Sequence, residues 1–282
     1  MRPARRRLAA VLAAAALVTG GALGATGPAA AAAPSAVAVP TVDVPPPGAN
    51  DFSCRPDAAH PQPVVLVNGT FETMEKNWVT MSPFLAGRGY CVFAFNYGDR
   101  ATGPIEDSAV ELKTFVARVL KATGSRKVDF VGHSQGGMMP RYYLKYLGGA
   151  KKVDDLVGIS PSNHGTTMSM DTGGLSPCRA CEQQAAGSAF LTDLNAGGDT
   201  VRGPDYTVIA TIYDEVVTPY QSQFLVGPAD RVTNILLQDR CPAAVIEHDQ
   251  TPNHPVVQEL TLDALRLDGP ASTTYQPDCG VL

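Results

Sequence analysis

Apolar residues along the chain alternate between short continuous runs and longer stretches with a helical period. Short continuous runs are typical of strands that are buried on both faces of a parallel sheet, and apolar spacings of three and four predict amphipathic helices. The short runs lie at 64–67, 91–95, 128–131, 156–159, 207–212 and 232–237, and the periodic stretches lie at 77–88, 105–123, 142–147 and 256–267. This alternation predicts an α/β fold with a mostly parallel sheet of about six strands and helices on both faces.

The start of the chain falls outside this pattern. Several arginines precede an apolar run from Leu8 to Val18, and an alanine-rich stretch follows. This order is typical of a cleaved secretory signal, here residues 1–33. A membrane anchor is the alternative, but the run is short for a membrane span and glycines interrupt it. Residues 34–50 are rich in Pro, Ala and Val and predict an exposed linker, which leaves 51–282 as a single domain.

No clear period is visible between Pro161 and Gly203. A structureless stretch of this length is unusual in a compact domain and is typical of functional surface loops. Two interpretations stay open. The stretch is either a flap over a binding site or an insertion that a disulfide holds together.

Charge and cysteine content narrow the class of protein. The formal net charge of -5 argues against a nucleic-acid partner, which would need a basic surface. An even set of cysteines in an exported chain predicts three disulfides and an extracellular location. The C-x-x-C pair could be a redox motif, but such motifs open a helix after a strand, whereas Gly174 and Pro177 indicate a loop, so a local disulfide is favoured. The six cysteines are Cys54, Cys91, Cys178, Cys181, Cys241 and Cys279.

The run at 128–131 leads into Gly132-His133-Ser134-Gln135-Gly136, and a helical stretch follows. Strand, tight turn and helix are the setting in which a serine hydroxyl projects from the end of a sheet on a strained turn. Glycines on either side let neighbouring backbone approach the turn closely. Ser134 is therefore the candidate nucleophile.

A serine hydroxyl needs a histidine base, and the histidine needs a carboxylate that orients it. On this type of scaffold the acid and then the histidine follow the serine, each on a loop after a later strand. Asp214 follows the run at 207–212, with Glu215 as its rival, since adjacent side chains point in opposite directions. His248 is favoured as the base over His254. The other histidines are excluded by position or by chain order, and these are His60, His133 and His164.

An acyl-transfer site also needs donors for the oxyanion. The backbone N–H of Gln135, directly after the nucleophile, is one candidate. Thr70, in the loop after the first buried strand, is the other, with its N–H and also its hydroxyl. Asn68-Gly69 could be a simple turn, but its place at the carboxyl end of a strand favours the functional interpretation.

Four blocks together resemble the α/β-hydrolase superfamily, and within it the secreted bacterial class 2 triacylglycerol lipases and the fungal lipase B type. The blocks are Leu66 to Thr70, Ser134 to Gly137, Asp214 to Pro219 and Cys241 to His248. The resemblance implies an α/β-hydrolase fold, a triad of Ser134, Asp214 and His248, and an oxyanion hole from Thr70 and Gln135. It implies disulfides Cys54–Cys91 and Cys241–Cys279, which leaves Cys178 with Cys181. It also places Val216 in the substrate pocket.

The chain departs from these relatives at two positions. Asn68 stands where relatives often have His or Pro, and His133 stands where the fungal form has Trp. Some bacterial lipases bind calcium, but no dense set of oxygen ligands is visible along the sequence, so neither a metal nor a cofactor is expected.

The expected activity is hydrolysis of carboxylic esters, such as triacylglycerols, through an acyl-enzyme on Ser134. The expected substrate is an ester or a lipid, including lipids at a lipid–water interface. The protein is expected to be a monomer without a stable membrane anchor. Phe224 and Leu225, shortly after the acid loop, are expected to add to an apolar surface for the acyl chain. The alternatives are a polyester depolymerase or acyltransferase with the same triad, and a binding protein with a silent site.

Overall fold

The computed structural model of the chain describes residues 44–169 and 177–281. The described residues belong to the compact unit Val42–Leu282. The expected signal segment 1–33 and most of the expected linker, up to residue 43, lie outside the described residues.

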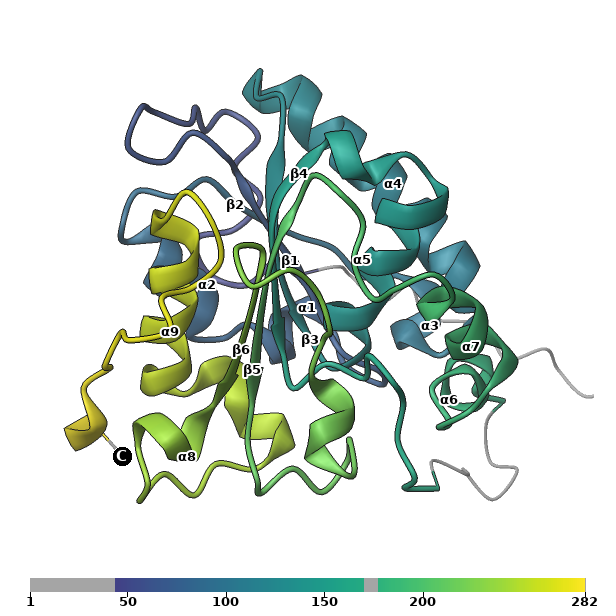
Figure 1. Cartoon of the computed structure of the whole chain (residues 1–282). Helices are drawn as coiled ribbons and strands as arrows, with labels where there is room; N and C mark the ends of the chain where they lie inside the picture. The colour runs from purple at the N-terminus through teal and green to yellow at the C-terminus, as the bar shows by residue number, and fades with distance from the viewer. Residues whose placement is uncertain (1–43, 170–176, 282) are drawn as a thin grey trace, which may run out of the picture. The chain divides into compact units, whose positions relative to one another are not determined.

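Six parallel strands form one sheet in the order β2-β1-β3-β4-β5-β6 (Figure 1). Their bounds are β1 Val64–Val67, β2 Val92–Ala94, β3 Val128–His133, β4 Val153–Ile159, β5 Asp205–Ala210 and β6 Val232–Leu236. The predicted α/β architecture is confirmed, and every pairing between these six strands is parallel. The carboxyl ends of all the strands therefore meet at one edge of the sheet, where ligands bind in folds of this kind.

Helices cover both faces of the sheet. Figure 1 shows α4 and α5 on one face, and α2 and α9 on the other. The α-helices are α1 Met74–Asn77, α2 Met81–Ala86, α3 Gly98–Ala101, α4 Ile105–Thr123, α5 Gln135–Tyr146, α6 Arg179–Gln183, α7 Ala189–Asn195, α8 Leu237–Arg240 and α9 Pro255–Arg266. The 3-10 helices are η1 Gly149–Lys151, η2 Tyr220–Gln223, η3 His248–Asn253 and η4 Cys279–Val281.

Alternate residues of β1 supply the two cores. Val65 and Val67 pack in the core that contains the buried face of α4, whereas Val64 and Leu66 pack in the core that contains residues of α2 and α9. Successive side chains of a strand point to opposite faces, so one short apolar run contributes to both cores. This is why β1 is buried along its whole length.

The predicted helices differ in how well they match. The 105–123 prediction coincides with α4, and Gly124 adopts the left-handed conformation that ends it. The 77–88 prediction is wrong as one helix, because the chain forms α1 and α2 with a break at Trp78 to Thr80. At the break, the Thr80 N–H and hydroxyl bond to Asn253 rather than continuing a helix. The irregular stretch 161–203 contains the short helices α6 and α7, which are too short to show a period.

The structure contains three disulfides, Cys54–Cys91, Cys178–Cys181 and Cys241–Cys279. This is the pairing that the resemblance implies. The C-x-x-C segment is not a plain loop, since Cys178 is the N-cap of α6. Within 44–169 and 177–281, no helix combines the length and the apolar character needed to cross a membrane.

Candidate active site

Ser134 lies on a strained turn between β3 and α5. Its backbone has φ 54° and ψ -123°, a conformation that a residue with a side chain rarely adopts and that costs about 1–3 kcal/mol. A Cβ on Gly132 would lie 1.9 Å from the carbonyl oxygen of Gly136, and a Cβ on Gly136 would lie 2.0 Å from that of Val67. The glycines are thus required because the start of α5 packs against β1 and β3.

Asp214 and His248 form a buried pair. Asp214 Oδ2 accepts a hydrogen bond of 2.8 Å from His248 Nδ1, and the side chains are 0% and 4% exposed. Asp214 Oδ1 accepts the N–H groups of Val216 and Val217, and Gln223 Nε2 donates to Oδ2. These bonds fix the carboxylate in one orientation. The bond to Asp214 also fixes a proton on His248 Nδ1, which leaves Nε2 as the ring nitrogen that can act as a base.

The rival residues lie elsewhere. Glu215 is exposed. His254 caps α9, since its Nδ1 accepts the N–H of Val256 at 3.3 Å. Asp214 is buried and Glu215 is exposed, so the aspartate is the member of this pair that meets His248.

Ser134 and His248 line one cavity of about 390 Å³. Among the described residues no hydrogen bond joins the Ser134 hydroxyl to the His248 imidazole. Such bonds are often long in the absence of substrate and tighten when it binds. The remaining lining residues are Gly69, Thr70, Phe71, Glu72, His133, Met168, Ser169, Val216 and Asp249.

Thr70 and Gln135 flank the same cavity from two elements. A Cβ on Gly69 would lie 3.1 Å from the Cβ of Ser134, so the loop after β1 runs directly beside the serine. In 44–169 and 177–281, neither the Thr70 N–H nor the Gln135 N–H donates to another protein atom. Two backbone donors next to a serine are the arrangement that an oxyanion requires.

His133, excluded as a base by its position, lies between the two halves of the site. The carbonyl oxygen of His248 only accepts, so His133 Nε2 carries a proton and donates to it at 3.1 Å. In the neutral ring Nδ1 is then an acceptor, and Asn77 Nδ2 donates to it at 3.1 Å, while Asn77 Oδ1 accepts the N–H of Gly69. Burial, and secondly the charge of His248, hold the pKa of His133 well below its usual range. His133 is therefore a neutral link between the Gly69 loop and the His248 loop.

One of the three predicted pocket residues lines the cavity and two do not. Val216 lines the cavity, but Phe224 and Leu225 do not. Asn234 of β6 bonds to both the N–H and the carbonyl of Leu225, at 3.0 and 2.8 Å, and this holds the segment against the edge strand. Leu225 belongs to the core and Phe224 packs against it. Their expected place at the acyl-chain surface is corrected accordingly.

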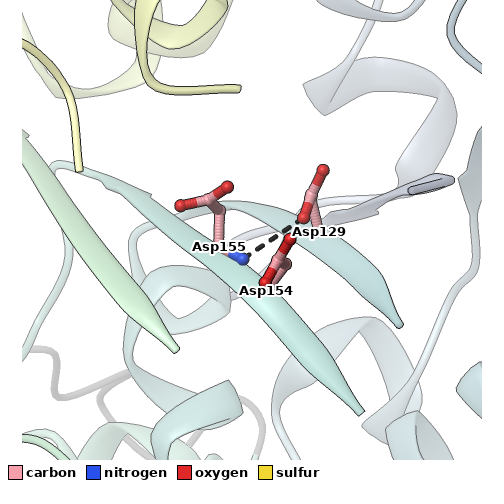
Figure 2. A group of neighbouring side chains, drawn as sticks. All are labelled: Asp129, Asp154 and Asp155. Atoms are coloured by element: carbon pink, nitrogen blue, oxygen red, sulfur yellow. Dashed lines mark hydrogen bonds between the residues drawn. The ribbon is translucent and has the colours of Figure 1, made fainter. Parts of the chain in front are cut away.

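Two groups of polar residues were not predicted from the sequence. Three carboxylates whose oxygen atoms lie within 4.8 Å of one another gather near the amino ends of β3 and β4, namely Asp129, Asp154 and Asp155 (Figure 2). Lys127 Nζ already bonds to Asp154 at 2.6 Å. Burial raises the pKa of Asp155 to about 10, so this carboxyl holds a proton at neutral pH, and burial also raises the pKa of Asp129 well above its usual range. The cluster is far along the strands from Ser134, which follows the carboxyl end of β3.

The other missed residues are buried amides that contact the site. Gln223 holds Asp214, and Asn77 holds His133. Glutamine and asparagine are common in loops and helices of any function, so no sequence signal separates these two from the rest. Their role follows only from what they contact.

A larger cavity of about 610 Å³ lies beside the residues that follow β2, lined by aromatic side chains such as Phe52, Phe95 and Phe115. Its described lining contains neither serine nor histidine. Of these two cavities, the smaller is therefore the one whose lining includes residues suited to nucleophilic chemistry.

A family model described as Lipase (class 2) matches residues 61–261. Proteins named triacylglycerol lipase from Pseudarthrobacter phenanthrenivorans and Burkholderia plantarii are each 34% identical over 91 residues, or 30% of this chain. The match spans only 28% and 25% of the length of these relatives.

Solved structures share the fold. Aspergillus fumigatus lipase B is similar with a TM-score of 0.71 and 24% identity, over 81% of this chain and 57% of that chain. The mature form of the Bacillus licheniformis lipase BlEst2 is similar with a TM-score of 0.60 and 15% identity, over 76% of this chain and 95% of that chain.

Proposed function

The chain belongs to the class 2 lipase family, and from this premise we propose that it hydrolyses carboxylic esters, triacylglycerols among them, through an acyl-enzyme on Ser134. The observation that carries the proposal is the buried Asp214–His248 pair beside a serine on a strained turn. The curated relatives named triacylglycerol lipase support the choice of substrate.

In the first half of the reaction, His248 Nε2 accepts the hydroxyl proton as Ser134 Oγ attacks the ester carbonyl carbon. Asp214 stabilises the resulting imidazolium through the bond to Nδ1. The negative charge that develops on the carbonyl oxygen is bound by the N–H groups of Thr70 and Gln135. When the tetrahedral intermediate collapses, the alcohol leaves with the proton from His248, and the acyl group stays on Ser134.

In the second half, water takes the place of the alcohol. His248 removes a proton from the water as its oxygen attacks the acyl carbon, and then returns the proton to Ser134 Oγ. The products are the carboxylic acid and the free enzyme. The cavity lining suits an apolar acyl group, because Phe71, Met168 and Val216 contribute to it beside the polar residues.

Location and assembly are part of the same proposal. Three disulfides persist in oxidising compartments, which supports an exported, extracellular enzyme. We propose that it acts as a monomer on esters or lipids without a stable membrane anchor.

The test is hydrolysis of p-nitrophenyl esters by the Ser134→Ala variant. Without the nucleophile, kcat should fall by about 10⁴- to 10⁶-fold while the melting temperature stays near that of the unaltered chain. Ser53→Ala, at an exposed serine far along the chain, is the matched control and should keep full activity. A fluorophosphonate probe should label the unaltered chain and not the Ser134→Ala variant. Equal hydrolysis by both would exclude Ser134, and no labelling at all would favour a silent binding protein.

A further inference from the structure

The hydroxyl of Thr70 accepts two hydrogen bonds from glutamine side chains. Gln135 Nε2 donates to Thr70 Oγ1 at 3.1 Å, and Gln184 Nε2 donates to it at 2.9 Å. Both glutamines are buried, with 0% and 1% of their surface exposed. A threonine hydroxyl has two acceptor lone pairs and one proton. The two amides therefore fill the acceptor capacity of Thr70.

The orientation of both amides is determined by backbone carbonyls. Gln135 Nε2 also lies 2.9 Å from the carbonyl oxygen of Ala101, and Gln184 Nε2 lies 3.2 Å from that of Ala180. A carbonyl oxygen only accepts, so in each side chain the atom that faces it must be the nitrogen. The opposite end of Gln184 agrees, since its Oε1 accepts the hydroxyl of Ser162 at 2.8 Å.

The proton of the Thr70 hydroxyl is left for another acceptor. Among the described residues, Thr70 Oγ1 donates to no protein atom, while Thr70 lines the cavity that contains Ser134. A hydroxyl that accepts from two buried donors cannot turn its proton toward either of them. Its proton is therefore available to an oxygen atom within the cavity.

From this geometry we propose that Gln184 is a positioning residue, which holds the Thr70 hydroxyl in the orientation that donates to the oxyanion. The inference rests on the proposed function and adds a residue that touches neither the substrate nor the reacting atoms. Gln184 follows α6, whose first turn the Cys178–Cys181 disulfide spans. In this proposal, the described part of the irregular stretch 161–203 places Gln184 against the loop that follows β1.

The experiment compares two substitutions of Gln184 by their kcat and KM on p-nitrophenyl esters. In Gln184→Glu, an ionised carboxylate accepts the Thr70 proton and withdraws the donor, so kcat should fall by about 10- to 100-fold with little change in KM. Gln184→Met removes the bond without adding an acceptor, and the loss should be smaller, about threefold to tenfold. Gln183→Met is the matched control, because this neighbouring buried glutamine bonds to Ile105 and Glu106 of α4 instead.

A double-mutant cycle with Thr70→Val separates positioning from general disruption. Thr70→Val removes the hydroxyl and keeps the backbone N–H, and kcat should fall by about 10²-fold. If Gln184 acts through that hydroxyl, Gln184→Glu or Gln184→Met should change kcat by less than about twofold in the Thr70→Val background. Additive losses would overturn the inference, as would a kcat in the Gln184 variants equal to that of the unaltered chain.

Folding is checked by the melting temperature of each variant. If Gln184→Glu does not fold, the cycle with the uncharged Gln184→Met decides the question. Ester hydrolysis that depends on Ser134 but not on Gln184 would refute this inference and leave the proposed function standing. A chain that hydrolyses no ester at all would refute the proposed function and the inference with it.

Discussion

At position 136 the neighbouring backbone leaves room for a hydrogen atom and nothing larger. A Cβ there would lie 2.0 Å from the Val67 carbonyl oxygen, which belongs to β1 and cannot move alone, because β1 is paired with β2 on one side and β3 on the other. The strain of Ser134 persists because this packing of α5 on the sheet holds it. The glycine next to the nucleophile is thus a requirement of the tertiary structure as well as of the turn.

We expect Gly136→Ala to destabilise the fold by more than about 3 kcal/mol and to reduce activity strongly, since the start of α5 must move and Ser134 moves with it. Thermal unfolding and ester hydrolysis measure the two effects. Gly280→Ala is the control, because its Cβ would meet only the carboxylate of Asp278 at 3.1 Å. A Gly136→Ala variant as stable and as active as the control would contradict this account of the turn.

At the scale of elements, the site joins segments that are distant in the chain. The link from Gly69 through Asn77 and His133 to the His248 carbonyl connects the loop after β1, helix α1, the end of β3 and the start of η3. The hydroxyl of Thr251 donates to the same carbonyl at 2.7 Å. The oxyanion loop and the histidine loop are therefore held in register by side chains rather than by strand pairing.

His133→Phe keeps a ring of similar size and removes both nitrogens, so we expect the free energy of unfolding to fall by about 1–3 kcal/mol near pH 8. This difference in stability between the variant and the unaltered chain should become smaller toward pH 5. In the unaltered chain the lowered pKa of His133 means that the unfolded state binds a proton below about pH 6.5 while the folded state does not, so stability falls as pH falls. The variant lacks this contribution. Melting temperatures from pH 5 to pH 8 measure the difference, and parallel curves would contradict the neutral, buried state of His133.

At the scale of the whole molecule, the two ends of the sheet carry polar residues with different consequences for the protein. The carboxyl ends of the strands carry the proposed catalytic residues, and the amino ends of β3 and β4 carry Asp129 and Asp155 (Figure 2). The Asp155 carboxylate has no hydrogen-bond partner among the described residues. Its burial, and secondly the charge of Asp129, raise its pKa to about 10. This end of the sheet therefore lowers stability at neutral pH.

The raised pKa of Asp155 makes stability depend on pH. Below about pH 4, Asp155 holds its proton in both the unfolded and the folded state. As pH rises, Asp155 ionises first in the unfolded state, so folding becomes less favourable until the pH reaches the folded pKa of about 10. We expect Asp155→Asn to raise the melting temperature, and the gain over the unaltered chain to widen from pH 5 to pH 9. Asp230→Asn, at an exposed aspartate, is the control. A gain that stays constant with pH would contradict the raised pKa.

Much of the fold could be predicted because its strands are short apolar runs and because α4 is long enough to show its period and its C-cap. The break between α1 and α2 could not be predicted, since it depends on Thr80 meeting Asn253 from the far end of the chain. Helices α6 and α7 were missed because five and seven residues are too few to establish a period. Phe224 and Leu225 were misplaced because apolar residues near a site are equally suited to the core.

The sequence by itself determined the alternation of strands and helices and the G-x-S-x-G turn, because both depend on local spacing, and it determined the candidate serine, acid and histidine through their order along the chain after successive strands. Only the tertiary structure decided which polar side chains meet: Gln223 with Asp214, His133 with the His248 carbonyl, and Gln184 with Thr70. These contacts join residues whose separation along the chain carries no pattern. Hydrogen bonding between buried amides and rings depends on distance and orientation in space, which exist only once the sheet and its loops have assembled.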